Sequence, residues 1–383
     1  MNHIHNVIKF SCLSFFLIAT SNSYAENSET QNTSSAESAT IAKFTESSPS
    51  STLILNFDLV NSLLDASVLD MGPSKRSWTA MEQPNTGTRI AQSVNLKTDL
   101  EGNKFTYELF NNDQQKEKLV TIKNYLENLP LDTPLNLYNK DEQLAYWLNL
   151  YNVSIINEVV KASPKRVLKP LLTGDSSILE QKLLNVAGVE LSLNDIQHKI
   201  LKTQYESDPL ILYGLYQGII GGPDILKTAF TGKNVYRLLE KNAINFINSN
   251  RGTTVNKRFH TVRTSYFYQL NADYFPDFNS DLKQHLLRFA NDDVSGEIKL
   301  ANELNPSITN WKVTDLYGTT QSFGKSAHVV VEGSDFQHQY DKQFAGALSR
   351  DQLLRMKNLM IVRAINLDGT SVTVTDLPSE DEQ

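Results

Sequence analysis

The strongest periodic pattern in the chain runs from about Lys140 to Lys161 and predicts one long helix. Its apolar residues recur at i, i+4, i+7 and i+11, which is the period of one helix face. Because further apolar residues occupy its other faces, we expect this helix at the centre of a hydrophobic core. The recurring residues are Leu144, Leu148, Tyr151, Ile155 and Val159.

Weaker patterns predict further helices. Residues 122–129 form a short one that Pro130 closes. Another begins near Ser192, whose hydroxyl suits the N-cap position, with Asp195 as its capping-box partner. The remaining helical patterns cover residues 235–248 and 281–290.

Strand patterns gather in the second half of the chain. Residues 210–216 are a candidate buried strand, and residues 258–269 carry a β pattern rich in Phe, Val and Tyr. Because helices come first and strands mixed with helices follow, we expect an α+β fold. Its helix-rich N-terminal part would pack on a mixed or antiparallel sheet. Further strand patterns lie at 311–316, 327–331 and 360–365, and Asp368-Gly369 predicts a hairpin between 360–366 and 371–374.

The first 25 residues are expected to be a secretory signal peptide. Lys9 precedes an apolar run at 10–20 that is too short to cross a bilayer, and Ser23-Tyr24-Ala25 provides the small residues of a cleavage site. Cleavage after Ala25 predicts a periplasmic or secreted protein. It would also remove Cys12, the only cysteine, so the mature chain could not form disulfides.

Composition divides the rest of the chain into three predicted parts. Residues 26–51 are rich in Ser, Thr, Asn and Glu, which is typical of a disordered tether. Residues 52–335 carry the apolar patterns of a folded domain, including a predicted long loop at 72–104. Residues 336–383 form a C-terminal extension with the hairpin and an acidic tail.

The net charge of −7 argues against general nucleic-acid binding, which needs basic patches that neutralise phosphates. Lys165, Arg166 and Lys169 form the single basic cluster, which is most simply a solvated helix end. No later apolar run approaches 18 residues, so no membrane span is expected after the signal is removed.

Three groups of residues could carry chemistry. On the long helix, Glu142, Tyr146 and Asn149 share one face, and Asn152 follows Asn149 by about one turn. Polar side chains on an otherwise apolar helix need hydrogen-bond partners when they are buried. They could tie loops to the core, or they could orient a reactive group in a groove.

The second group pairs Asp195 with His198 on a predicted helix. A carboxylate beside an imidazole fixes its tautomer and raises its basicity, which is half of an acid–base device. The structural alternative is a capping Asp with a His that is exposed or packed in the core. One His and one Asp are too few ligands for a metal site, so no metal or cofactor is expected.

The third group is the Gly-rich stretch from Gly218 to Pro223. It lacks the spacing of dinucleotide-binding and phosphate-binding loops. The chain also lacks the G-x-S-x-G and H-E-x-x-H motifs of hydrolases. A double Gly followed by Pro is first of all a turn.

Three segments stand out as motifs: NKDEQLAYWLNLYN (139–152), LSLNDIQHKILK (191–202) and DPLILYGLYQGIIGGP (208–223). Together they resemble the DUF547 family, a domain of unknown function found in bacterial secreted proteins and in plant proteins with a leucine zipper. The first two segments match closely and the third in part. The resemblance covers about residues 55–320 and implies a fold related to papain-like or transglutaminase-like enzymes.

The departures from the family pattern fall together on the third segment. The resemblance places the family's two cysteines at Gln217 and Gly222 and one of its histidines at Leu212. An amide is not a nucleophile and Gly has no side chain, so any thiol chemistry of relatives is expected to be lost here. The matching positions include Glu142, Asn149, Asn152, Asp195 and His198.

We therefore expect an exported, non-catalytic protein with a binding or assembly role in the cell envelope. A groove lined by the residues named above would hold a peptide, a glycan or a partner protein. The alternative is a cysteine-independent hydrolase or transferase that uses His198 with Asp195, acting on water or on a hydroxyl such as Thr228 or Ser265. A surviving site requires His198, the polar face of the long helix and the 217–222 turn to share one cleft.

Overall fold

The computed structural model describes residues 43–74, 76, 98, 101–162, 167–256 and 261–315. The predicted signal peptide, the strand patterns beyond residue 316 and the C-terminal hairpin lie outside these residues. Apart from the start of the folded part, the domain boundaries stay predictions.

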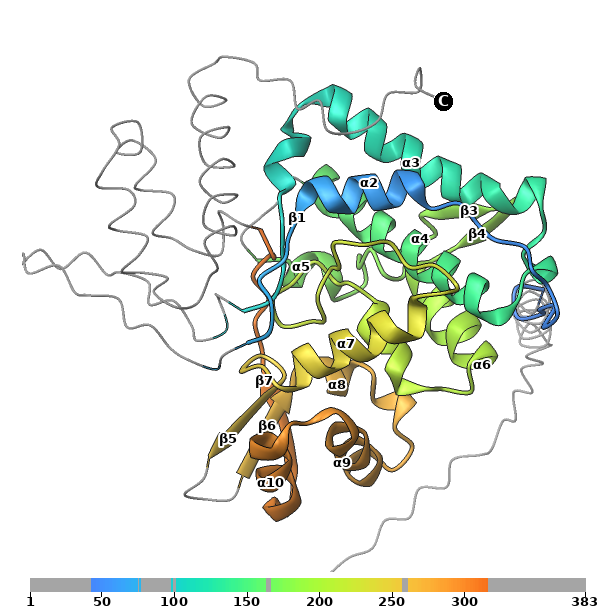
Figure 1. The fold of residues 1–383 in the computed structure, drawn as a ribbon. Helices are drawn as coiled ribbons and strands as arrows, with labels where there is room; N and C mark the ends of the chain where they lie inside the picture. The colour runs from blue at the N-terminus through green and yellow to red at the C-terminus, as the bar shows by residue number, and fades with distance from the viewer. Residues whose placement is uncertain are drawn as a thin grey trace, which may run out of the picture.

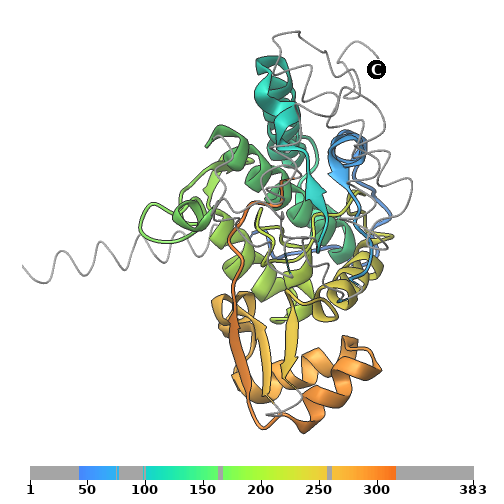
Figure 2. The same cartoon turned by 90° about the vertical axis from the view of Figure 1, so that its left-hand side faces the viewer.

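Helix α4 (Lys140–Lys161) forms the core of the molecule, with the bounds that its apolar pattern predicts. The Asn139 side chain begins it by accepting a hydrogen bond from the Glu142 N–H at 3.0 Å. Helix α3 (Asp113–Asp132) packs against α4, and α2 (Asp58–Ser67) lies at the same end of the molecule (Figures 1 and 2).

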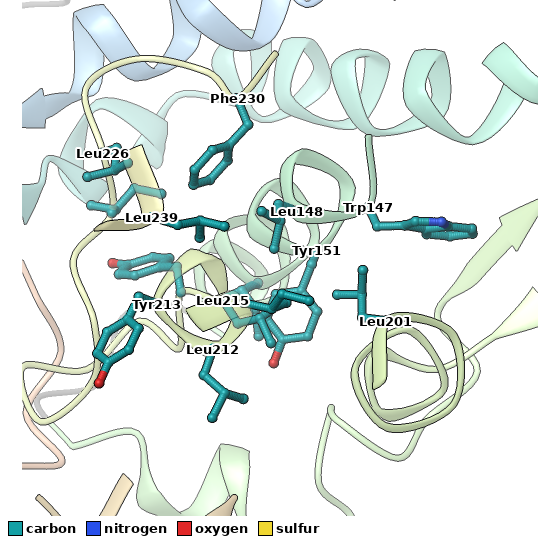
Figure 3. Packing of buried hydrophobic residues seen from close by; sticks show 14 of the residues in the cluster. Trp147, Leu148, Tyr151, Leu201, Leu212, Tyr213, Leu215, Leu226, Phe230 and Leu239 are labelled. Carbon is teal, nitrogen blue, oxygen red and sulfur yellow. The ribbon is translucent and has the colours of Figure 1, made fainter. Parts of the chain in front are cut away.

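Close packing around α4 depends on one glycine. Gly214 lies where an added Cβ would come within 2.7 Å of Leu148 and 2.8 Å of Leu239. Only a residue without a side chain lets its segment approach α4 and α7 (Val235–Ile247) this closely. Figure 3 shows Leu148, Leu239 and the neighbouring Tyr213 in this core.

The helix predicted at 122–129 is longer than its apolar pattern. It occupies all of α3, and Pro130 lies inside its last turn instead of closing it. Proline removes the hydrogen bond to the carbonyl four residues earlier, which here belongs to Leu126. The Tyr146 hydroxyl donates to that carbonyl at 2.9 Å. A side chain from α4 therefore satisfies the acceptor that Pro130 leaves free.

The predicted tether is packed where the structure describes it. Phe44 is buried in the core, with its ring 5.3 Å from the Trp147 ring in an edge-to-face arrangement. The Gln143 amide also donates to the Glu46 carbonyl at 2.9 Å. The folded part therefore begins before residue 52.

The strand predicted at 210–216 is wrong. Residues Pro209–Gly214 form a buried 3-10 helix, η4. The Asp208 carboxylate caps it by accepting from the Leu210 N–H at 2.9 Å, and Pro209 occupies the first helical position. These local signals favour a helical turn over a strand.

The main sheet is mixed and lies with α9 (Phe278–Phe289) and α10 (Asp292–Leu300) at the end of the molecule opposite α2 and α3 (Figures 1 and 2). Strand β6 (Thr261–Ser265) pairs antiparallel with β5 (Thr253–Asn256) and parallel with β7 (Leu304–Ile308). The β pattern at 258–269 is therefore only partly right. It ends at Ser265, whose hydroxyl accepts from the Phe267 N–H at 3.2 Å and begins α8 (Tyr266–Leu270).

The remaining elements are short. They are β1 (Val68–Leu69) with β2 (Lys104–Phe105), β3 (Leu184–Val186) with β4 (Val189–Leu191), η1 (Tyr107–Asn111), η2 (Leu135–Leu137), α5 (Lys169–Leu172), η5 (Ala272–Tyr274) and α6 (Lys202–Gln204). This arrangement of helices with small sheets confirms the α+β class.

Candidate functional site

The helix after Ser192 begins with the predicted capping box. The Asp195 N–H donates to Ser192 Oγ at 3.0 Å, and the Ser192 N–H donates to Asp195 Oδ2 at 2.8 Å. Two ammonium groups bind the same carboxylate, Lys182 at 2.6 Å and Lys199 at 2.7 Å. Burial would raise the pKa of Asp195, but these hydrogen bonds outweigh it and hold the pKa well below its ordinary value. Asp195 is therefore a buried structural anion.

The predicted pairing of Asp195 with His198 is wrong. The segment Asp195–Leu201 is a π-helix, η3, instead of the expected α-helix. A π-helix forms i→i+5 hydrogen bonds and turns less per residue, so side chains three positions apart no longer share a face. Such segments occur frequently at functional sites, and this one separates His198 from the capping carboxylate.

His198 pairs instead with Asp273. Its Nδ1 lies 3.0 Å from Asp273 Oδ2, and Lys202 binds the same oxygen at 2.7 Å. Burial would raise the pKa of Asp273, but the hydrogen bonds from Lys202 and His198 lower it below its ordinary value. A carboxylate can only accept, so in the neutral imidazole Nδ1 carries the proton and Nε2 is left as an acceptor.

His198 and Gln217 line the same cleft, which has a volume of about 200 Å³. Its walls come from the end of α5, the π-helical segment, the end of α8 and the turn that follows η4. Trp311 adds an aromatic ring, 6.4 Å from the ring of Tyr266. The other polar lining residues are Thr173, Ser177, Glu180, Asn194, Gln197 and Asn271.

Gln217 is the buried polar residue of this cleft that lacks a full set of partners. Its side chain is 6% exposed, and its Oε1 has no hydrogen-bond partner among the described residues. Leaving a buried acceptor unsatisfied costs about 1–3 kcal/mol. A ligand that donates a hydrogen bond to Oε1 would recover this free energy.

The turn at 217–222 is held from two directions. On one side, the Gly221 N–H donates to the Asn310 carbonyl at 2.9 Å, which joins the turn to the backbone that carries Trp311. From the other side, the Ser265 hydroxyl donates to the Gly221 carbonyl at 2.9 Å. The position of Gln217 therefore depends on segments far away in the sequence.

Arg251 also holds this turn in place, and no sequence pattern predicted that role. Its Nη1 donates to the Gly222 carbonyl at 2.7 Å, and its Nη2 binds Asp224 Oδ1 at 2.7 Å. The guanidinium lies 5.1 Å from the centre of the Phe246 ring. Both charged groups are almost completely buried. No local pattern marks Arg251, because all three contacts arise from folding.

Two of the asparagines of α4, Asn149 and Asn152, bind backbone groups outside the cleft. Asn149 accepts from the Phe230 N–H at 3.1 Å and donates to the Phe230 carbonyl at 2.8 Å. Asn152 accepts from the Tyr216 N–H and donates to the Gly214 carbonyl, both at 2.9 Å. These bonds tie loops to the core. Asn152 also orients the segment that leads directly into Gln217.

Glu142 has a similar structural position, away from His198. Its Oε2 accepts from the Leu55 N–H at 3.3 Å. Burial raises the pKa of Glu142, while the N–H groups of Leu55 and Gly232 oppose that shift. A surviving site was expected to bring the polar face of α4, His198 and the 217–222 turn into one cleft. The cleft contains His198 and Gln217 but not the polar face of α4, so this requirement is not met.

The hydroxyl candidates also lie apart from His198. Ser265 is fully buried and engaged with the Gly221 carbonyl. Thr228 lines a separate cavity of about 370 Å³, together with Leu55 and Asn61. Leu212, at the family's histidine position, is buried in the core.

Within the described residues, no three His, Cys, Asp or Glu side chains gather closely enough to hold a metal ion. Over the same part of the chain, no helix combines the length and apolarity that a membrane crossing requires.

The fold and the cleft define an α+β domain built around one buried helix, with a histidine and a glutamine among the residues that line one polar cleft. Residues 135–247 match the model of the family described as "Protein of unknown function, DUF547". The resemblance to the DUF547 family is confirmed for residues 135–247, a range that includes helices α4 and α7. No curated protein and no solved structure matches the chain. The match is shorter than the predicted range of 55–320, so Asp273 and Trp311 lie beyond it.

Proposed function

We propose that the chain is an exported, non-catalytic binding protein of the cell envelope, whose ligand occupies the cleft between His198 and Gln217. Binding sites combine a concave surface with a few placed polar groups. This cleft has both, and the observation that carries the proposal is Gln217 itself. Its unpartnered acceptor is suited to binding a ligand, whereas an amide cannot attack one.

The size of the cleft limits what it holds. Pockets for drug-sized ligands have volumes of about 300–1,000 Å³, and this cleft has about 200 Å³. It therefore takes a small polar group, such as the end of a peptide or of a glycan. An assembly role would follow if that group belongs to a larger envelope component.

A second candidate function is a cysteine-independent hydrolase. The geometry that favours it is the pairing of His198 Nδ1 with Asp273, which leaves Nε2 as a base toward the cleft. Water would have to be the nucleophile, because the nearby hydroxyls are engaged. Thr173 donates to the Lys169 carbonyl at 2.8 Å, and Ser177 accepts from the Leu179 N–H at 3.2 Å.

Activity assays separate the two functions. We expect purified mature protein to show no turnover of ester, amide, peptide or glycoside substrates beyond that of His198→Ala. Turnover that is lost in both His198→Ala and Asp273→Asn would replace the binding function with the hydrolase.

Retention of ligands from envelope extract tests the binding role directly. Wild type is compared with Gln217→Leu, and Gln284→Leu on the exposed side of α9 is the matched control. A small molecule or glycan retained by wild type and control but lost in Gln217→Leu supports the proposal. Gly222→Trp is a poorer probe, because Gly222 is buried beside Gln217.

Export is part of the proposal and has its own measurement. Cleavage after Ala25 predicts that the mature chain begins at Glu26. Mass spectrometry of the protein from the periplasmic or secreted fraction should find this N-terminus. A chain that keeps residues 1–25 and stays in the cytosolic fraction would contradict it.

A further inference from the structure

Residues that line the cleft carry hydrogen-bond acceptors that a ligand could satisfy. Gln217 Oε1 has no partner, and His198 Nε2 is an acceptor because Nδ1 donates to Asp273. Glu180 adds a carboxylate, one oxygen of which accepts from Asn194 at 2.6 Å. A ligand that fills the cleft must therefore supply N–H or O–H donors.

The charges around the cleft favour a neutral ligand. The cations on and beside the π-helical segment are already engaged by two aspartates, so they offer little to an anion. On the aromatic wall, the Lys169 ammonium lies 5.9 Å from the centre of the Trp311 ring, where a ligand cation would otherwise bind. Glu180 is exposed, and an exposed ion pair contributes only about 0–1 kcal/mol. The engaged cations are Lys182, Lys199 and Lys202.

One wall of the cleft is apolar. Trp311 and Leu270 line it, and Tyr266 lies beside Trp311 on the same side of α8 as Leu270. Leu270 is 40% exposed and Tyr266 is 36% exposed. The ligand therefore needs an apolar face for this wall as well as donors for Gln217 and His198.

An extended peptide does not fit this combination well. Peptides in extended form bind by adding a strand to a free sheet edge. The residues that line the cleft lie in helices, turns and irregular segments, and none of them belongs to a strand. A pyranose ring has the required chemistry, because its C–H groups form an apolar face and its hydroxyls surround the edge as donors.

We propose that the cleft binds a single neutral sugar residue, presented as the end or a branch of a glycan. This inference rests on the binding role proposed above. The C–H face of the ring lies against the wall formed by Leu270 and Trp311, and its hydroxyl or acetamido donors bind Gln217 Oε1 and His198 Nε2. The volume of about 200 Å³ admits one ring and leaves the rest of the glycan outside.

Titration with defined trisaccharides tests the proposal. The probes are the N-acetylglucosamine trimer, maltotriose and the deacetylated, cationic glucosamine trimer, followed by calorimetry or saturation-transfer NMR. We expect saturable binding of at least one neutral trimer to wild type and to Gln284→Leu. Loss of one neutral hydrogen bond should weaken it about threefold to tenfold in Gln217→Leu. Trp311→Ala tests the partly exposed wall, and the cationic trimer should bind more weakly than its acetylated parent.

The possible outcomes test the sugar proposal separately from the proposed binding role. Absence of saturable binding by both neutral trimers overturns the sugar proposal, as does equal binding by wild type, Gln217→Leu and Trp311→Ala. If a small peptide binds in a manner that depends on Gln217 while the trimers do not, the sugar is wrong and the binding role stands. Turnover that depends on His198 removes the binding role itself.

Discussion

A Cβ placed on Gly222 would lie 3.7 Å from the Cβ of Gln217 across the turn that joins them. Disulfide bonds connect Cβ atoms about 3.5–4.5 Å apart. Gly222 is also outside the left-handed backbone region, so a side chain there needs no strained conformation. The positions to which the resemblance assigns two cysteines are therefore close enough for a disulfide in this chain.

The variant Gln217→Cys/Gly222→Cys should form this disulfide under oxidising conditions. Closing a loop of about six residues stabilises the folded state by about 2 kcal/mol in the chain-entropy treatment. Thiol titration should find no free thiol in the oxidised mature protein, and urea unfolding with and without reductant should show the gain. Gln217→Ser/Gly222→Ala is the matched control without a bond. Two titratable thiols after oxidation would show that the turn does not have this geometry.

Arg251→Met should destabilise the fold by about 3–5 kcal/mol. The change leaves the buried Asp224 carboxylate without its cation and the Gly222 carbonyl without its donor. Adding Asp224→Asn should restore part of the loss, because the second change removes the unpaired charge. Urea unfolding followed by circular dichroism measures both.

Arg263→Met provides the comparison for the buried arginine. Arg263 is exposed and binds Ser307, so its loss should change the free energy of unfolding by less than about 1 kcal/mol. Equal stabilities of Arg251→Met and Arg263→Met would mean that the buried guanidinium does not hold the turn.

Features that depend on neighbouring residues were predictable from the sequence. The bounds of α4 follow from its apolar period, and the capping box of Ser192 and Asp195 follows from their spacing. The run of Ile, Leu and Tyr at 210–216 predicted a strand, and that prediction was wrong. In the structure, Asp208 and Pro209 begin a helical turn there. Local signals at the start of an element therefore decide cases in which apolar content alone is ambiguous.

The candidate site was predictable only in part. His198 and Gln217 were singled out, and they line one cleft. The partner of His198 was missed, because Asp273 lies 75 residues further along and no pattern links the two. Arg251 was missed for the same reason. The π-helical turn removed the spacing argument for Asp195, since that argument assumes 3.6 residues per turn.

Asn149→Ala should destabilise the protein by about 2–3 kcal/mol, because it leaves both the N–H and the carbonyl of Phe230 buried and unpaired. In a folded part of this size that corresponds to a fall in Tm of about 3–5 °C. Asn157→Ala is the matched control, since this buried amide donates only to the Glu158 side chain. Differential scanning calorimetry should rank the two variants in this order. The reverse order would show that Asn149 is not a principal clamp.

His285 is a partly buried base that the cleft does not use. Its Nε2 lies 3.0 Å from the Tyr213 hydroxyl, and the two rings stack with centroids 5.6 Å apart. Burial, with a smaller contribution from Arg288, lowers the pKa of His285 from 6.5 to about 4. The folded protein therefore keeps this imidazole neutral over a pH range in which the unfolded chain protonates it.

Stability should fall as the pH is lowered from about 6.5 to about 4. The unfolded chain binds a proton at His285 below about pH 6.5, whereas the folded protein binds it only near pH 4, so acid favours unfolding between these values. A difference of about 2.5 pKa units corresponds to about 3 kcal/mol at the lower limit. Urea unfolding of wild type and His285→Gln at several pH values measures this contribution, because other titrating groups are common to both. If the difference between the two proteins stays constant from pH 7 to pH 4, His285 is not held neutral by the core.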